Sequence, residues 1–132
     1  MLLKLMHTKG QKMQIKLWLD DERDPRSAYI QSEFGANGDE IWVKTSDVAI
    51  QYLKHGNVES ISLDHDLGPS SGTGLDVANW IEEQAFHGLI PRLTWYVHSM
   101  NTCGKKNILK AMEKADEFWT SQIEGEDSVR EN

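Results

Sequence analysis

Short hydrophobic runs alternate along the chain with longer segments in which apolar residues recur at helical spacing. The runs lie at residues 14–20, 40–44, 58–63 and 93–97. Each has the length of a strand and ends in polar residues, a pattern typical of strands buried in a sheet. The pattern therefore predicts four strands.

Three of the intervening segments are predicted to be helices. Apolar side chains recur at steps of three and four over residues 47–54, from about residue 74 to Gly88, and over residues 105–119. Thr73 and Asp76 are spaced as a capping box for the second helix, and Ser46 is the expected N-cap of the first. Residues 26–39 carry two glycines and a weak helical stripe. We expect an irregular connection there, with room for one helical turn.

This alternation predicts an α/β fold. Parallel strands need long crossover connections, and these crossovers are right-handed in nearly all proteins. We therefore expect a mostly parallel four-stranded sheet with strand order 2-1-3-4. One domain should span residues 14–120, between a flexible leader at 1–13 and a flexible acidic tail at 121–132.

Acidic residues and histidines follow three of the predicted strands. The clusters are Asp20-Asp21, Asp64-His65-Asp66 and His98-Ser99. The carboxyl ends of parallel strands meet at one edge of a sheet, where open α/β folds bind ligands. The sequence therefore predicts one crevice that gathers these side chains.

Such a gathering of carboxylates needs charge compensation. Two carboxylates about 5 Å apart repel by roughly 3 kcal/mol at an effective dielectric near 20. A raised pKa, a nearby Lys or Arg, or a bound cation would relieve the repulsion. Oxygen ligands suit Mg²⁺ or Mn²⁺, so we predict a divalent metal on Asp20, Asp21, Asp64 and Asp66. The alternative is that some of these aspartates only cap helices or lie in solvated turns.

The histidines are candidates for proton transfer, and the polar loop after the fourth strand is a candidate for phosphate binding. His65 and His98 follow neighbouring strands, so both are predicted to reach a shared ligand and exchange protons with it. Ser99, Asn101 and Lys105 precede or open the last helix and form a predicted phosphate-binding group. The alternatives are histidines that bond only to the backbone and an ordinary exposed lysine.

Composition narrows the class of ligand. The formal net charge of −7 argues against an extended nucleic-acid surface. No apolar run reaches the roughly 18 residues of a membrane helix, and the single cysteine, Cys103, fits a reducing compartment. We expect a cytoplasmic protein that binds a small ligand and no membrane.

Several motifs together resemble one known family. They read LWLDDERDP (17–25), WVKT (42–45), ISLDHDLG (61–68), TGLDVANWIE (73–82) and VHSMNTCG (97–104). The chain looks like the cyclic-phosphate processing receiver domains, a family with the receiver fold of response regulators. The resemblance implies a flavodoxin-like domain that handles cyclic phosphates on RNA ends or nucleotides, often in phage or bacterial conflict systems. It also implies Asp20 and Asp21 as metal ligands and Asp64 as the central acid.

The sequence departs from signalling receivers in two places. It shows no fifth strand bearing the lysine that contacts the phosphoryl group, so we expect a sheet truncated to four strands. Its first helix is predicted to be a loop, and His65 and His98 have no counterpart in signalling receivers.

These observations leave three hypotheses for function. The first is a metal-dependent phosphoesterase that acts on a cyclic phosphate of a nucleotide, an ADP-ribose derivative or an RNA end, with Asp64, His65 and His98 as its catalytic residues. The second is a non-catalytic module that binds a nucleotide or a host protein, as a phage inhibitor would. The third is a phosphorylation switch with Asp64 as the acceptor.

Overall fold

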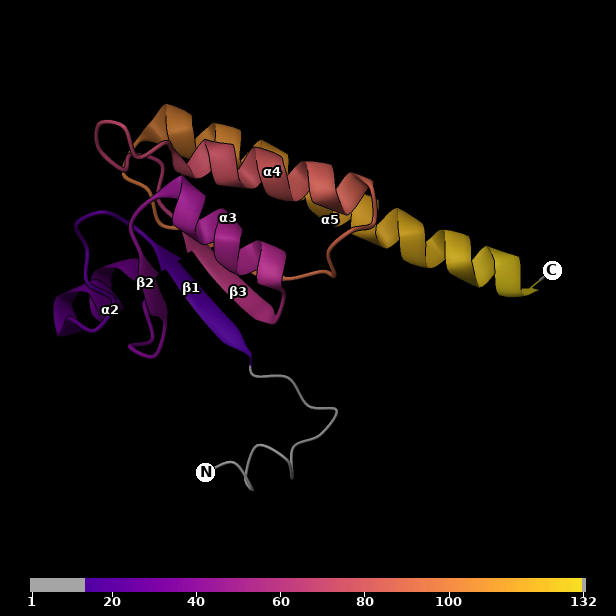
Figure 1. Cartoon of the computed structure of the whole chain (residues 1–132), viewed down its shortest axis with the longest axis horizontal. Helices are drawn as coiled ribbons and strands as arrows, with labels where there is room; N and C mark the ends of the chain where they lie inside the picture. The colour runs from indigo at the N-terminus through magenta and orange to yellow at the C-terminus, as the bar shows by residue number, and fades with distance from the viewer. Residues whose placement is uncertain (1–13, 132) are drawn as a thin grey trace, which may run out of the picture.

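A computed structural model describes residues 14–131 as a four-stranded parallel sheet flanked by helices (Figure 1). The strands are β1 (Ile15–Leu19), β2 (Ile41–Val43), β3 (Val58–Leu63) and β4 (Thr94–Val97), in the order β2-β1-β3-β4. The helices are α2 (Ala28–Phe34), α3 (Ser46–His55), α4 (Gly74–Phe86) and α5 (Thr102–Glu131). The predicted fold class and strand order are confirmed.

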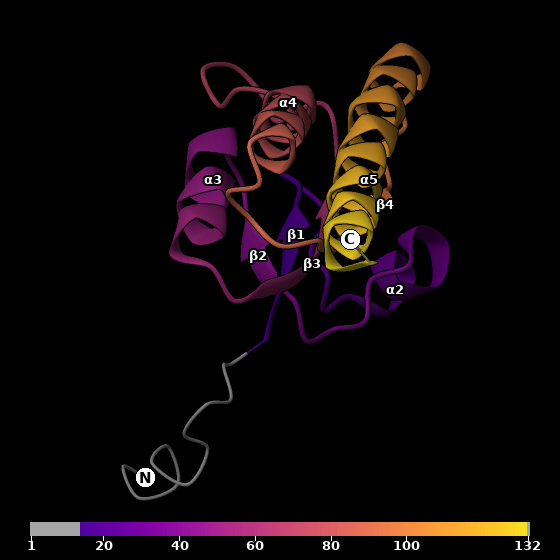
Figure 2. The ribbon, with the colours of Figure 1, turned by 90° about the vertical axis from the view of Figure 1, so that its right-hand side faces the viewer.

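The sheet is covered unequally on its two faces. Leu17, Leu19, Ile61 and Leu63 point to the face where α3, α4 and α5 pack and form the main core with them. Successive side chains of a strand alternate between faces, so Trp18 points to the opposite face, where it packs with Ile30 of α2. In Figure 2, α3 lies on one side of the strands and α2 on the other.

Residues 26–39 are more ordered than the sequence predicted. They contain α2, which is 7 residues long, and Gly35 ends it in the left-handed conformation with φ of 83°. Ile30 and Phe34, four residues apart, pack against Trp18 and Trp42. This one-sided apolar contact stabilises a helix whose own periodicity is weak.

Helix termini differ from the predictions at three places. Thr45, not Ser46, is the N-cap of α3 and accepts a hydrogen bond from the backbone N–H of Val48 at 3.2 Å. Helix α5 begins at Thr102 rather than near residue 105, because the Asn101 side chain accepts a hydrogen bond from the backbone N–H of Gly104 at 2.8 Å. It also continues to Glu131, where the pattern predicted an end near Trp119.

Other predictions are confirmed or lie beyond what the structure tests. Thr73 and Asp76 form the predicted capping box of α4. The leader at 1–13 lies outside the described residues, and flexibility beyond residue 120 stays a prediction. Within residues 14–131, no helix combines the length and the apolar character needed to cross a membrane.

Candidate functional site

Strand pairing brings Asp20, Asp64 and His98 to one edge of the sheet. Each directly follows the last residue of its strand, and backbone hydrogen bonds join the ends of the neighbouring strands. The N–H of Asp64 donates to the carbonyl of Leu19 at 3.0 Å, and the N–H of His98 donates to the carbonyl of Leu63 at 3.0 Å. One ligand-capable atom from each of the three side chains lies within 4.8 Å of the others. The predicted meeting of the strand ends is therefore confirmed.

Asp20 is fully buried and its carboxylate is saturated with hydrogen bonds. Oδ1 accepts from the backbone N–H groups of Glu22 and Arg23 at 2.8 and 2.9 Å. Oδ2 accepts from the Arg23 guanidinium at 3.2 Å and from Nε2 of His98 at 3.0 Å. Burial alone would raise the pKa of Asp20, but the hydrogen bonds from His98 and the backbone outweigh it and hold the pKa below its ordinary value. Asp20 is therefore a fixed negative charge beneath the site.

Asp64 has the opposite electrostatic character. Burial, and then the charge of Asp20, raise its pKa above the ordinary value, while His98 and Arg23 oppose the shift. The nearest Arg23 nitrogen lies 3.8 Å from Asp64 Oδ2, beyond hydrogen-bond distance. Asp64 is thus the acid of the pair that gains most from a proton or a cation.

Arg23 is a functional candidate that the sequence analysis missed. Its guanidinium lies between Asp20 and Asp64 and stacks over the ring of Phe34, 4.4 Å from the centroid. The signal in the sequence was its position three residues after Asp20, in the turn that follows β1. Two of the predicted ways to relieve carboxylate repulsion, a nearby arginine and a raised pKa, are therefore both present.

A hollow of about 330 Å³ opens over these residues at the carboxyl edge of the sheet. We call it the crevice. Its lining includes four acidic side chains and one basic one: Asp21, Glu22, Asp64, Asp66 and Arg23. Gly68 and Met100 complete the wall. Asp21 and Asp66 thus join Asp64 as predicted, while Asp20 lies buried beneath the hollow.

The two histidines do not share one environment. His98 stacks on Trp18 with ring centroids 3.9 Å apart, and its Nδ1 bonds to the Ser62 hydroxyl at 2.8 Å. Since its Nε2 bonds to Asp20, both ring nitrogens are occupied inside the protein. His98 is therefore placed to orient Asp20 rather than to exchange protons with a ligand.

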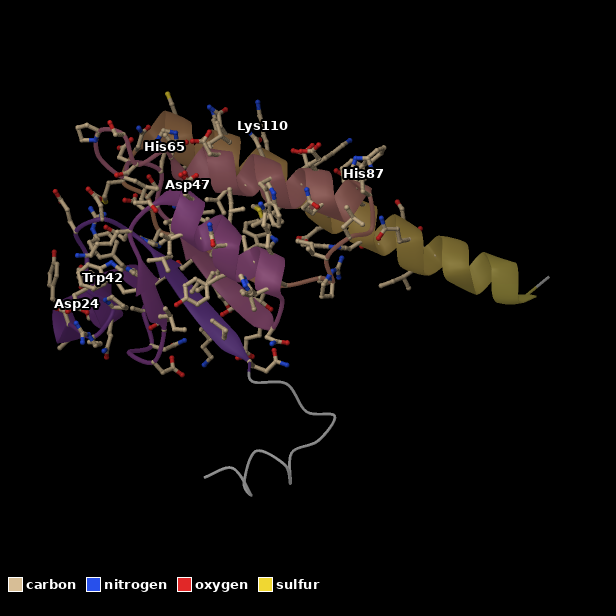
Figure 3. All side chains as sticks on the ribbon, in the orientation of Figure 1. Asp24, Trp42, Asp47, His65, His87 and Lys110 are labelled. Atoms are coloured by element: carbon tan, nitrogen blue, oxygen red, sulfur yellow. The ribbon has the colours of Figure 1, made fainter. Side chains whose placement is uncertain are left out.

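His65 lies closer to solvent, beside the start of α5. Figure 3 shows it near the beginning of α4 and α5, away from Trp42 and Asp24 at the α2 side. Its Nδ1 bonds to Asp66 Oδ1 at 2.8 Å, and this bond is the main cause that lowers the pKa of Asp66. Gly104 packs against the imidazole ring so closely that a side chain at that position would overlap it. His65 is thus held between Asp66 and α5.

The predicted phosphate-binding residues have mixed placements. The Ser99 hydroxyl accepts from the backbone N–H of Asn101 at 3.1 Å, and the Asn101 amide donates to Asp66 at 3.2 Å. Both residues therefore build the loop that borders the crevice. Lys105 is exposed on α5 and is not part of the crevice wall. A phosphate contact by these three residues stays a prediction.

The donor set fits a hard divalent cation. Asp64, Asp21 and Asp66 present carboxylates to the crevice, where acids outnumber the single arginine. Among the side chains that the structure describes, the acids and histidines whose ligand atoms lie close enough together to share one metal ion are Asp20, Asp64 and His98. Asp20 and His98 already bond to each other and to other groups inside the protein, so Asp64 is the member of this set that faces the crevice.

The electrostatics of Asp64 predict a gain of stability on its neutralisation. A carboxyl whose folded-state pKa is raised costs no stability below its unfolded pKa, and its cost is complete above the folded pKa. In metal-free buffer, Asp64→Asn should therefore melt at a higher temperature than the wild type at pH 7. The gain should shrink as the pH falls toward the ordinary aspartate pKa of about 3.9.

Thermal unfolding between pH 3 and pH 8 with EDTA measures this effect. Asp47→Asn, an exposed change in the first turn of α3, is the matched control and should show no gain. If the wild type melts at or above the melting temperature of Asp64→Asn at pH 7, the ionised Asp64 carboxylate does not destabilise the fold.

Comparison with known protein families identifies a match over most of the chain. The family model described as the cyclic-phosphate processing receiver domain matches residues 15–114. That range begins at the first residue of β1 and ends inside α5, so it includes all four strands and every residue of the crevice wall. No curated protein and no solved structure was found to match the chain.

Proposed function

This chain belongs to the cyclic-phosphate processing receiver domain family, and we propose that its crevice hydrolyses a cyclic phosphate with a bound divalent metal ion. The observation that carries the proposal is the state of Asp64. Its carboxylate lines an acidic crevice, its pKa is raised, and the Arg23 guanidinium lies beside it. Perturbed acids beside a fixed cation in a hollow are typical of catalytic sites.

The reaction sets defined tasks for the protein. A water oxygen forms a bond to phosphorus, one of the two ring P–O bonds breaks, and the water proton ends on the released sugar oxygen. The site must therefore bind the phosphate, stabilise the added negative charge and move one proton.

Metal binding falls to the acids that face the crevice. Asp21, Asp64 and Asp66 would hold Mg²⁺ or Mn²⁺, which supplies Lewis acidity toward a phosphoryl oxygen. Asp20 acts from beneath, because its fixed charge and its bond to Arg23 keep the wall in place.

Arg23 is the cation best placed to bind the phosphate. Arginine pairs well with phosphate oxygens because its planar guanidinium donates in parallel directions. Asp20 and the ring of Phe34 hold this guanidinium at the crevice wall, so little side-chain entropy is lost when an anion binds.

Proton transfer is assigned to His65. Its Nδ1 is bonded to Asp66, an arrangement that leaves Nε2 to exchange the proton. The Asp66 carboxylate would hold the imidazole in one tautomer and orientation, as the aspartate of a Ser-His-Asp triad does. His98 takes no proton in this scheme and serves as a positioning residue for Asp20.

The test is a substrate panel assayed with the full chain. Nucleoside 2′,3′-cyclic phosphates, cyclic-ended RNA and a cyclic phosphate of ADP-ribose are incubated with Mn²⁺ or with EDTA. We expect turnover of at least one of them with Mn²⁺ and none with EDTA. Absence of turnover on the whole panel would reject the proposal, and binding without conversion would favour the non-catalytic module instead.

A further inference from the structure

A second cavity lies on the α2 face of the sheet, outside the crevice. Parallel sheets are normally covered by helices on both faces. Here α2 packs over Trp18 and Trp42, while β3 presents Ser60 and Ser62 to the same face. Small serines take less room than the branched residues usual in such strands, and a hollow of about 350 Å³ remains above them. Its volume falls within the range of small-ligand sites.

Flat apolar rings and polar groups share the lining of this cavity. Phe34 and Tyr96 supply aromatic rings, and Tyr96 is 59% exposed, whereas Trp18 in the lining is only 1% exposed. Ser60 and Asn37 supply a hydroxyl and an amide. Aromatic rings stack on planar ligands, and an amide beside them can bond to a polar ring edge. The lining therefore suits a planar nitrogen heterocycle better than a purely apolar group.

Two pairs of contacting side chains lie between the cavity and the crevice. Arg23 lines the crevice and stacks on Phe34, which lines the cavity. His98 also lines the cavity and bonds to Asp20 beneath the crevice. The two hollows are therefore adjacent in the fold, on either side of these contacts.

We propose that this cavity binds the nucleobase of the substrate. The inference rests on the proposed function, because the crevice must take the cyclic phosphate. It also narrows the substrate class. The sugar that carries the cyclic phosphate bears a base, as in a nucleoside 2′,3′-cyclic phosphate or an RNA 3′ end, whereas the phosphorylated ribose of an ADP-ribose cyclic phosphate bears none.

Calorimetric titration with free nucleosides in EDTA isolates this site from the crevice. Adenosine, guanosine, cytidine and uridine are each titrated into the full chain. We expect at least one to bind, and Asp64→Asn to bind it with unchanged affinity. Ser60→Phe fills the cavity and should weaken binding at least tenfold. Ser32→Phe, the same change at an exposed position of α2, should leave binding unchanged.

A second variant keeps the test independent of folding. Tyr96→Ala removes an exposed ring that lines the cavity and should weaken nucleoside binding by about tenfold, as loss of one stacking partner does. Circular dichroism and melting curves check that each variant is folded.

The outcomes separate this inference from the proposed function. Nucleoside binding that depends on Ser60 and Tyr96 supports the cavity assignment even if no cyclic phosphate is hydrolysed. Absence of binding at millimolar nucleoside, or binding that neither variant weakens, would overturn it even if the crevice proves catalytic.

Discussion

Asp64→Asn is expected to lower the rate of cyclic-phosphate hydrolysis by about 10²- to 10⁴-fold, the usual loss when a proton-transfer or charge-stabilising group is removed. Asparagine keeps the size of the side chain but neither binds a hard cation as a carboxylate does nor carries charge. Single-turnover rates with saturating Mn²⁺ measure the loss directly. The same variant should be more thermostable at pH 7, so unfolding does not account for its inactivity.

The control for this experiment is Asp47→Asn, which makes the same chemical change on an exposed turn of α3. It should retain the wild-type rate. A rate for Asp64→Asn within threefold of the wild type would remove Asp64 from the reaction and with it the proposed catalytic site.

Asp20→Ala is expected to lower the free energy of unfolding by about 3–5 kcal/mol, as when one partner of a buried ion pair is removed. Asp20 is 0% exposed, and its two oxygens accept four hydrogen bonds. The substitution leaves the Arg23 guanidinium, the His98 imidazole and two backbone N–H groups without an acceptor. Urea unfolding at pH 7 measures the change.

Asp39→Ala is the matched control for that measurement. Asp39 also forms an ion pair, with Lys16 at 3.0 Å, but its side chain is 61% exposed. Exposed ion pairs contribute little, so the control should unfold close to the wild type. Equal stability losses in Asp20→Ala and Asp39→Ala would contradict the account of Asp20 as a buried anchor.

The sequence was sufficient to predict the sheet and the edge where the acids meet. Strand periodicity depends only on neighbouring residues, and the crossover rules hold for parallel sheets in general. Together they predicted the order β2-β1-β3-β4 and the proximity of Asp20 and Asp64. The capping box of Thr73 and Asp76 was predictable for the same reason, because its hydrogen bonds join residues three apart.

Features that depend on tertiary packing were not predictable. Helix α2 forms because Ile30 and Phe34 pack against Trp18 of β1 and Trp42 of β2. These tryptophans belong to other elements, so the periodicity of residues 26–39 does not reveal the contact. The role of Arg23 depends on the ring of Phe34, which it contacts only after folding. The two hydrogen-bond partners of His98 are Asp20, directly after β1, and Ser62 in β3. Periodicity shows that a histidine follows a strand but not which way its ring turns.

The central proposal is that Asp21, Asp64 and Asp66 bind one divalent cation at the carboxyl edge of the sheet. Anomalous diffraction from crystals of the full chain soaked in Mn²⁺ tests it most directly. We predict one strong manganese peak in the crevice at coordination distance from Asp64, and its loss in Asp64→Asn. A wild-type map with no peak at Asp64, or with manganese bound only elsewhere, would contradict the account.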